Sequence, residues 1–331
     1  MKALITGATG FVGANLVEAI TQRGWQARAL HRKSSSLKAL HGLTYESALG
    51  DVTVAESLLA AMRGVDVVFH VAAVADYWRT GKEHLYHVNV DGTRNMLWAA
   101  CQAGRERGRP LRVVFVSSVA ALGRPPFGQP VNESAPFNLR PEQFHYGYSK
   151  LLAESHVRAC VAEGLDAVIV NPAVVIGLRD VNLISGSIIL ETARRRIPFY
   201  PPGGVCVIDV EDLCAGCIAA AERGRAGERY ILGGENLWHR DMLGIVCDVV
   251  GRPRPTIPLP GLVLRGLGAL LDAASRQASF KLPFNGQQAR FAAETFWFDS
   301  TKARRELGLT TRPFAESAQR AYDWYRQNGY L

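Results

Sequence analysis

The sequence lacks the features of a membrane-spanning or secreted protein. None of its apolar runs reaches the roughly 18 residues that a membrane span needs. The N-terminus turns glycine-rich at Gly7, which is too soon for a signal peptide. Internal repeats and low-complexity segments are also missing. These absences argue against a transmembrane segment, and a signal-free chain with reduced thiols is expected in the cytoplasm.

Cysteine is scarce, and its spacing does not suit a metal site. The chain has six cysteines, of which Cys214 and Cys217 form a lone C-x-x-C pair inside an apolar helical pattern. A zinc site needs a second pair of ligands, and the sequence offers none at a suitable spacing. We therefore predict that both thiols pack in the core and that no metal is bound.

Dense clusters of positive charge are also few. The net charge is +8, but the lysines and arginines are scattered, and the one run, Arg194–Arg196, is short. This pattern argues against a nucleic-acid partner and favours a solvated surface with some affinity for anionic ligands. With 48% hydrophobic and 21% charged residues, the chain is typical of a globular protein with one large core or two domains.

A glycine loop follows the first apolar run. Residues 2–6 are predicted to form a buried strand, and Gly7, Gly10 and Gly13 come directly before a helical pattern that runs to Gly24. Gly7 permits a tight turn, Gly10 lets the backbone approach a pyrophosphate, and Gly13 lets the helix lie close to the sheet. Strand, glycine loop and helix in this order predict a dinucleotide-binding turn.

The second predicted strand, 25–31, ends without an acidic residue. A carboxylate at this position would accept hydrogen bonds from the adenosine ribose and repel a 2′-phosphate. Here the strand runs into Arg32 and Lys33 instead. Because both cations suit a phosphate, we predict NADP(H) as the cofactor. NAD remains possible, because both residues can also be ordinary loop charges.

Further strands alternate with helices and end in small or polar residues. Strands are predicted at 43–48, 65–71, 112–116 and 165–172, with a helix at 54–63 and another opening at 89–93, capped by Asn89 or Asp91. This rhythm predicts an α/β fold with a Rossmann-type, doubly wound parallel sheet. Ligands bind outside the carboxyl ends of such strands, where Asp51, Ala72, Ala73 and Ser118 are found.

Tyr146 and Lys150 are the candidate catalytic pair. If a helix begins near His145, the two side chains share one helix face because they are four residues apart. A lysine beside a phenol favours the phenolate and lowers its pKa from about 10. The sequence therefore predicts a tyrosine that works as a general acid or base.

These motifs resemble, in this order, those of the extended short-chain dehydrogenase/reductase family: Thr6–Gly13, Asp51, His70–Ala73, Asn89–Thr93, Ser117–Ser118, Tyr146 with Lys150, and Asn171–Pro172. The match runs to about residue 234, with weaker echoes at 298–308. Within the family, the chain is similar to the dihydroflavonol-reductase-like branch and to bacterial proteins labelled hopanoid-associated sugar epimerases. Sugar epimerases often have Val-Tyr-Gly where this chain has Ala121-Leu122-Gly123, which weighs against epimerase activity.

The resemblance implies a role for each site residue. Tyr146 would be the acid/base, and Lys150 would lower its pKa and bind the nicotinamide ribose. Ser118 would hold the substrate oxygen, and Asn89 would support the site. The residues and the resemblance together predict these cofactor contacts: Gly7, Thr9, Gly10, Phe11, Val12, Gly13, Arg32, Lys33, Asp51, Val52, Ala72, Ala73, Ser117, Tyr146, Lys150, Asn171, Pro172, Ala173 and Val174.

The pattern of the C-terminal half predicts a smaller, mostly helical substrate domain. We expect residues 1–175, with 205–234 returning, to bind the cofactor, and 176–204 with 235–331 to bind the substrate. Elements expected here are a helix at 182–195, helix-start caps at Asp209 and Asp212, a strand at 229–232 and an apolar helix at 256–275. That last helix either packs on the substrate domain or contacts a membrane surface as a lipid-facing lid or patch.

Three functions remain open. The first is an NADP(H)-dependent reductase or dehydrogenase acting on a small, largely apolar aldehyde, ketone or alcohol. The second is a nucleotide-sugar epimerase or dehydratase with tightly bound NAD, and the third is a cofactor-binding scaffold or sensor. The first is favoured by aromatic candidates for the substrate side, Tyr77, Trp78, Phe127, Phe137, Phe199 and Tyr200. A diphosphate would need clustered arginines, and the loose candidates are Arg179, Arg240 and Arg290. A homodimer is possible.

Overall fold

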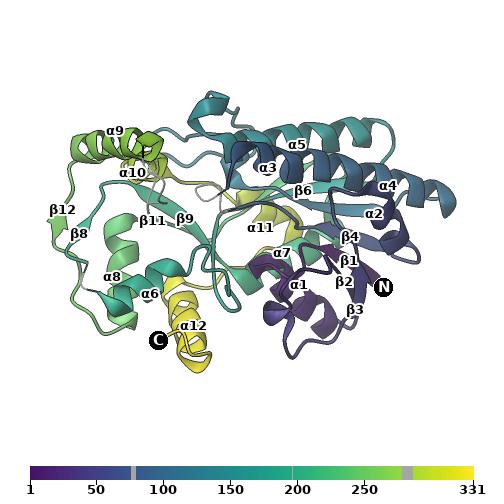
Figure 1. Ribbon diagram of the computed structural model, residues 1–331, viewed down its shortest axis with the longest axis horizontal. Helices are drawn as coiled ribbons and strands as arrows, with labels where there is room; N and C mark the ends of the chain where they lie inside the picture. The colour runs from purple at the N-terminus through teal and green to yellow at the C-terminus, as the bar shows by residue number, and fades with distance from the viewer. Residues whose placement is uncertain (76–79, 196, 278–285) are drawn as a thin grey trace.

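The computed structural model describes residues 1–75, 80–195, 197–277 and 286–331, with side chains described up to 271 and again from 286 (Figure 1). Tyr77, Trp78 and Arg196, which the sequence analysis singled out, lie outside the described residues. No described helix is long and apolar enough to cross a bilayer.

A seven-stranded parallel sheet forms the centre of the larger part of the molecule. Its order is β10-β6-β5-β4-β1-β2-β3. The strands are β1 Lys2–Thr6, β2 Gln26–His31, β3 Glu46–Leu49, β4 Val67–His70, β5 Arg112–Val116, β6 Ala167–Pro172 and β10 Arg229–Leu232. The chain winds outward from β1 in both directions, so the predicted doubly wound Rossmann-type sheet is confirmed. The carboxyl ends of β1 and β4 are neighbours at the point where the winding reverses, which is where such sheets bind ligands.

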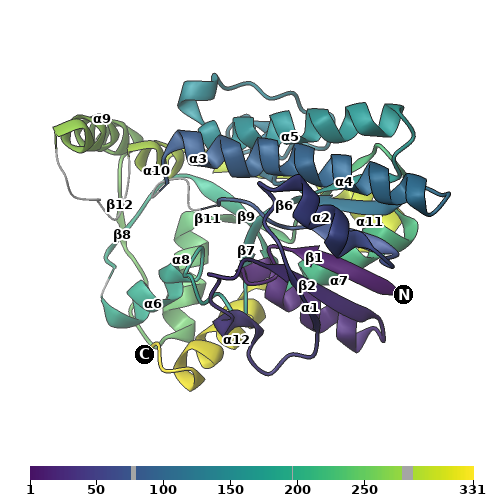
Figure 2. The same cartoon turned by 45° about the vertical axis from the view of Figure 1, so that its right-hand side comes forward.

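Helices cover both faces of this sheet (Figure 2). On one face lie α1, Phe11–Gln22, and α7, Val210–Arg223, and on the other lie α2 Ala55–Met62, α4 Gly92–Glu106 and α5 His145–Ala162. Strands buried on both sides need continuous apolar residues, and β4 and β6 are buried along their whole length. Cys214 and Cys217 are fully buried on α7 as free thiols, which confirms that they pack in the core.

The helix predicted to open at Asn89 begins earlier. It starts as α3, Lys82–Tyr86, and continues through a π-helical turn, His87–Asp91, into α4. Asp91 has right-handed helical backbone angles, and its side chain caps nothing. The prediction of a cap at Asn89 or Asp91 was therefore wrong. The extra residue of a π-turn rotates the side chains that follow, and such turns are frequent at functional sites.

A second, smaller sheet begins where the chain leaves β6. Strand β7, Val174–Ile176, pairs with β9, Gly204–Asp209, which also pairs with β11, Glu235–Trp238, and β13, Thr295–Phe296. Asp209 caps α7 by accepting from the Glu211 backbone N–H at 2.8 Å, as predicted. The predicted cap at Asp212 was wrong, because this residue lies inside the helix.

Helices α6 Ser187–Arg194, α8 His239–Val249 and α12 Phe314–Gln327 pack against the second sheet around a third apolar core. Helix α6 starts later than the predicted residue 182, because the Asp180 carboxylate accepts from three backbone N–H groups at 184–186 and holds them in a turn. The remaining elements are the 3₁₀ helices Lys38–Leu40, Val119–Leu122 and Pro141–Gln143, the strand pair β8 Phe199–Tyr200 and β12 Ile257–Pro258, and the helices α9 Gly261–Gln277, α10 Gly286–Phe291 and α11 Thr301–Leu307.

Candidate active site

The glycine loop forms a tight backbone cradle between β1 and α1. Gly7 has φ +67°, and a Cβ on it would lie 2.7 Å from the Ala72 Cα at the end of β4. A Cβ on Gly13 would lie 2.1 Å from the Gly7 carbonyl oxygen. The Gly10 N–H closes the turn by donating to that same oxygen at 3.0 Å. This space, which a side chain would fill, fits a pyrophosphate at the N-terminus of α1.

A buried histidine joins the ends of β1 and β4. His70 Nδ1 lies 2.8 Å from Thr6 Oγ1, and its Nε2 lies 3.1 Å from Thr93 Oγ1. Burial lowers the His70 pKa to about 3, so the ring is neutral. Thr93 donates its own proton to the Asn89 carbonyl, so Nε2 carries the ring proton and Nδ1 accepts from Thr6. The sequence analysis missed this role, although His70 stands in the strand-end motif.

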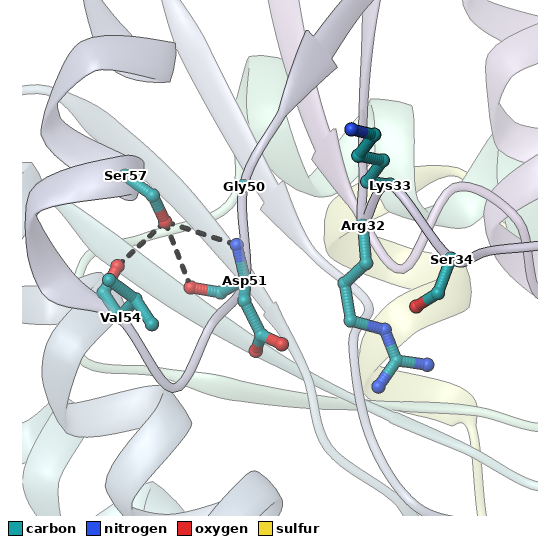
Figure 3. A pocket seen from close by; sticks show the side chains of 7 residues that line it. All are labelled: Arg32, Lys33, Ser34, Gly50, Asp51, Val54 and Ser57. Carbon is teal, nitrogen blue, oxygen red and sulfur yellow. Dashed lines mark hydrogen bonds between the residues drawn. The ribbon is translucent and has the colours of Figure 1, made fainter.

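Arg32 and Lys33 line an open cavity of about 510 Å³ together with Asp51 (Figure 3). Asp51 is held in place because its Oδ1 accepts from the Thr53 N–H and hydroxyl, both at 2.9 Å. Ser57 accepts from the Asp51 N–H at 3.0 Å and fixes the backbone of the turn. The structure therefore brings Arg32 and Lys33, which follow β2, into one cavity with Asp51, which follows β3.

The other predicted cofactor contacts fall into three groups. Thr9 and Val12 are partly exposed in or beside the glycine loop, whereas Phe11, the first residue of α1, is buried in the core. Val52 is buried beside Gly92, and Ala72 and Ala73 are partly exposed after β4. Pro172 and Ala173 are buried at the end of β6, and Val174 is 40% exposed.

Tyr146 meets Ser118 at the carboxyl end of β5. Helix α5 begins at His145, as predicted, so Tyr146 lies in its first turn. The Tyr146 and Ser118 side chains are hydrogen-bonded to each other. Burial raises the Tyr146 pKa above its ordinary value, and the bond to Ser118 opposes this rise. The expected lowering by Lys150 was therefore wrong for this structure, because loss of water disfavours the phenolate.

Lys150 lies one helical turn further along α5. Its Nζ donates to the Val116 carbonyl oxygen at 3.0 Å, and the residue is 3% exposed. Burial lowers the Lys150 pKa to about 8, while the charge of Glu154 acts in the opposite direction. Tyr146 and Lys150 thus lie on one side of the same helix, facing the end of β5.

Glu154 is the centre of a buried hydrogen-bond network below the site. Its role was not predicted from the sequence. It is fully buried, and its Oε1 accepts from Ser117 Oγ and Asn171 Nδ2, both at 2.7 Å. Its Oε2 accepts from Arg158 at 2.7 Å and Arg229 at 3.4 Å. Ser117 therefore uses its hydroxyl on Glu154, and its predicted contact with the cofactor stays a prediction.

Asn171 links this network to Ser118. Besides Glu154, its Nδ2 donates to the Ser118 carbonyl oxygen at 2.9 Å. Its Oδ1 is buried and has no hydrogen-bond partner among the described residues. An amide oxygen of this kind fits a nearby donor, so Asn171 suits the predicted place beside a bound group.

Asn89 fastens the active-site helix to the loop after β4. Its Oδ1 accepts from the Val74 N–H at 2.7 Å, and its Nδ2 donates to Ser149 Oγ at 3.1 Å. Ser149 donates in turn to the Tyr146 carbonyl oxygen at 2.7 Å. A chain of hydrogen bonds therefore runs from Asn89 through Ser149 to the backbone of Tyr146.

An aromatic wall adjoins Tyr146. The Phe144 ring lies 6.1 Å from that of Tyr146 and 5.0 Å, edge to face, from that of Phe291. Phe296 continues the wall at 5.0 Å from Phe291. These phenylalanines come from three separate segments, which is why sequence spacing did not reveal them.

The aromatic residues named from the sequence lie elsewhere. Phe127 contacts Trp238, with ring centroids 5.7 Å apart, and Phe137 contacts Tyr148 at 6.0 Å. Phe199 and Tyr200 form β8, and Phe199 is 45% exposed. Neither of these two ring contacts involves Tyr146.

The arginines considered for a diphosphate are engaged in other contacts. Arg179 pairs with Glu18 on α1 at 3.0 Å and donates to carbonyl oxygens at 39 and 41. The Arg240 guanidinium lies 5.7 Å above the ring of Tyr200. Arg290 lies in α10. Binding a diphosphate through Arg179 would therefore require breaking its pair with Glu18.

Comparisons with known proteins identify relatives along the whole chain. Residues 3–233 match the model of the NAD dependent epimerase/dehydratase family. A Synechocystis sp. protein provisionally named dihydroflavonol 4-reductase is 37% identical, over 99% of this chain and 95% of its own. Sterol demethylase protein B of Methylococcus capsulatus is 34% identical over the full length of both chains. The solved structure of a nucleoside-diphosphate-sugar epimerase from Pseudomonas aeruginosa is 28% identical, with a TM-score of 0.82, over 100% of this chain and 99% of that one.

The family match covers more than half of the chain, and the two relatives exceed 30% identity over nearly all of it. The protein therefore belongs to the NAD dependent epimerase/dehydratase family, the extended short-chain dehydrogenases/reductases, and is an NAD(P)-dependent oxidoreductase.

Proposed function

We propose that the chain transfers hydride between NADP(H) and the carbonyl or hydroxyl carbon of a largely apolar aldehyde, ketone or alcohol. The observation that carries this proposal is the Tyr146–Ser118 hydrogen bond at the end of β5, with Lys150 behind it and the aromatic wall beside it. We also propose that residues 1–175 and 205–234 hold the cofactor, because β10 lies in the main sheet and α7 covers it. Residues 176–204 and 235–331 then hold the substrate.

The chain's own residues supply the proton and its orientation. The glycine cradle and the cavity at Arg32 hold the cofactor, which supplies or receives the hydride. In reduction, the Tyr146 hydroxyl gives its proton to the substrate oxygen, and Ser118 Oγ hydrogen-bonds the same oxygen as charge develops there. Lys150, one helical turn further along α5 with its ammonium on the Val116 carbonyl, would hold the nicotinamide ribose beside Tyr146. Oxidation follows the same path in reverse.

The surroundings of Tyr146 favour an apolar substrate. Phe144, Phe291 and Phe296 offer apolar area, which contributes about 25 cal/mol per Å² buried. A nucleotide diphosphate gains mainly from paired cations, and Arg179 is already paired with Glu18. The name of the Methylococcus relative, sterol demethylase protein B, points to the same class of ligand.

NADPH should bind more tightly than NADH. Arg32 and Lys33 lie at the cavity mouth, and hydrogen bonds to charged groups contribute about 1.5–3 kcal/mol each. We expect wild-type affinity for NADPH to exceed that for NADH by at least about tenfold, and Arg32→Asp to reverse the order. Fluorescence titration of both cofactors measures this. Equal wild-type affinities would contradict the assignment.

A nucleotide-sugar epimerase with tightly bound NAD is the second candidate. It is supported by the likeness to the Pseudomonas epimerase and by the family that the chain matches. Such an enzyme oxidises and re-reduces one substrate carbon without releasing its cofactor. The as-purified protein would then carry NAD and would not consume added NADPH.

A single set of assays separates the two candidates. NADPH oxidation is followed with a panel of hydrophobic aldehydes and ketones, with and without UDP-sugars, and epimer formation is followed by chromatography. We expect reduction of the apolar carbonyl compounds, little inhibition by UDP-sugars and no epimer. Epimer formation without carbonyl reduction would overturn the proposal in favour of the epimerase.

A further inference from the structure

Helix α9 exposes an apolar face at the outer edge of the molecule. Leu262 is 82% exposed and Leu270 is 70% exposed, and Val263 and Leu267 lie on the same side of the helix by their spacing. In both views α9 lies at the periphery, with α10 next to it (Figures 1 and 2). We call these four side chains the α9 apolar face.

The opposite side of α9 packs against α10, and this packing holds the helix in place. Leu264 is 6% exposed, and Gly268 lies so close to the Gly286 carbonyl oxygen that a Cβ would meet it at 2.8 Å. The helix is therefore anchored on α10 by one side, and the α9 apolar face is not needed for that contact. Large exposed apolar groups gathered on one face indicate an interaction surface.

The strand pair that precedes α9 also exposes apolar side chains. Ile257 of β12 is 47% exposed and pairs in register with Phe199 of β8, which is 45% exposed. Residues paired in register project to the same side of a sheet. Exposed apolar side chains are therefore found on β8 and β12 as well as on α9.

Exposed arginines lie in α9 and in the segment before it. Between Asp248 and Asp272 the chain has three arginines, Arg252, Arg254 and Arg265, and no acidic residue. All three are exposed; Arg254 pairs with Asp248, and Arg265 pairs with Glu294. Arg240 adds a further cation over the ring of Tyr200 in β8. An apolar helix face with a cationic rim has the chemistry of helices that lie in the interface of an anionic bilayer.

We propose that the α9 apolar face docks onto the negatively charged surface of a lipid bilayer. A second copy of the chain fits this surface less well, because a two-fold contact places the same face on both sides and so brings the arginines of the rim together. Anionic headgroups pair with those arginines, and the acyl region receives the leucines.

This docking would bring the site close to the bilayer. Helix α10 carries Phe291, which packs on Phe144, and Gln287, which donates to the Gln143 carbonyl oxygen. Gln143 and Phe144 lie three and two residues before Tyr146, so a short chain of contacts links α9 to the catalytic tyrosine. Access of a bilayer-dissolved substrate to Tyr146 is a consequence that rests on the proposed function, whereas docking itself does not.

The test measures vesicle binding without turnover. Full-length protein is co-sedimented with unilamellar vesicles of phosphatidylcholine alone, or of phosphatidylcholine and phosphatidylglycerol in equal parts. We expect the wild type to bind the mixed vesicles at least about tenfold more tightly, because each arginine near an anionic surface adds to the attraction. The Leu262→Ser, Leu270→Ser double variant should lose at least about tenfold of this binding. Added salt should weaken the binding.

A matched control is Leu331→Ser, since Leu331 is 45% exposed at the C-terminus, away from α9 (Figure 1). It should bind vesicles like the wild type, and all variants should keep the wild-type melting temperature. Absence of wild-type binding, or equal binding by the double variant, would overturn the proposal. So would a dimer in sedimentation velocity that the double variant abolishes while vesicle binding is absent. Because the readout needs no substrate, its failure is distinguishable from failure of the proposed reaction.

Discussion

Replacing Tyr146 by phenylalanine is expected to lower kcat for carbonyl reduction by about 10²–10⁴-fold while cofactor binding is retained. The substitution removes only the hydroxyl that meets Ser118, and the ring keeps its contact with Phe144. The substrate oxygen would then develop charge without the proton that Tyr146 supplies. Single-turnover NADPH oxidation measures the chemical step, and fluorescence titration measures the cofactor affinity.

The matched control is Tyr148→Phe. Tyr148 lies two residues along the same helix, and its ring contacts Phe137 at 6.0 Å, outside the aromatic wall. This variant should keep wild-type turnover. A Tyr146→Phe enzyme that retained more than about a tenth of the wild-type rate would contradict the acid–base role, because such groups contribute at least about 10²-fold.

The main sheet could be predicted because its central strands β1, β4, β5 and β6 are short and largely continuous apolar runs. Burial on both faces demands this composition, and small or polar residues then mark where a strand ends. Gly7 could also be predicted, because only a residue without Cβ fits at φ +67° so close to Ala72. A local backbone requirement of this kind is visible in the sequence.

Contacts between distant segments could not be predicted. Asp212 reads as a helix-start cap, but its carboxylate accepts from the Arg312 backbone N–H at 2.7 Å and pairs with the guanidinium at 3.1 Å. Asn89 is also predicted to cap a helix from its residue type and position alone. Its side chain instead accepts from the Val74 N–H and donates to Ser149 Oγ. In both cases the side chain is hydrogen-bonded to a residue distant in the sequence, although its local propensity favours capping a helix.

In the site, too, local patterns could be predicted and contacts between distant segments could not. Tyr146 and Lys150 were found because four residues separate them on one helix, and Glu154 continues that spacing by a further four. That signal was present, but a carboxylate in a helix is ordinarily read as solvated. Phe291 and Phe296 carried no such signal, because only folding brings them to Phe144. The sign of the Tyr146 pKa shift was wrong because burial cannot be read from spacing.

Replacing Glu154 by glutamine should both destabilise the fold and change the pH dependence of catalysis. The carboxylate is fully buried and accepts from Ser117, Asn171, Arg158 and Arg229. Losing one partner of a buried ionic network costs about 3–5 kcal/mol, since the remaining charges stay desolvated. Urea unfolding measures this loss. Arg158→Met is the control. The Arg158 side chain is 41% exposed, so its ion pair with Glu154 should contribute only about 0–1 kcal/mol to the free energy of unfolding.

The pH profile separates a catalytic effect from a loss of stability. Burial lowers the Lys150 pKa to about 8, and the charge of Glu154 raises it against that effect. If protonated Lys150 is needed, wild-type kcat/KM for reduction should fall as pH rises through about 8. Glu154→Gln removes the supporting negative charge, so the Lys150 pKa should drop and the fall should begin at lower pH. Activity of the variant should therefore recover toward the wild-type value on acidification, which a purely structural defect would not do. An unshifted profile in a folded Glu154→Gln enzyme would show that Glu154 does not act on the reaction through Lys150.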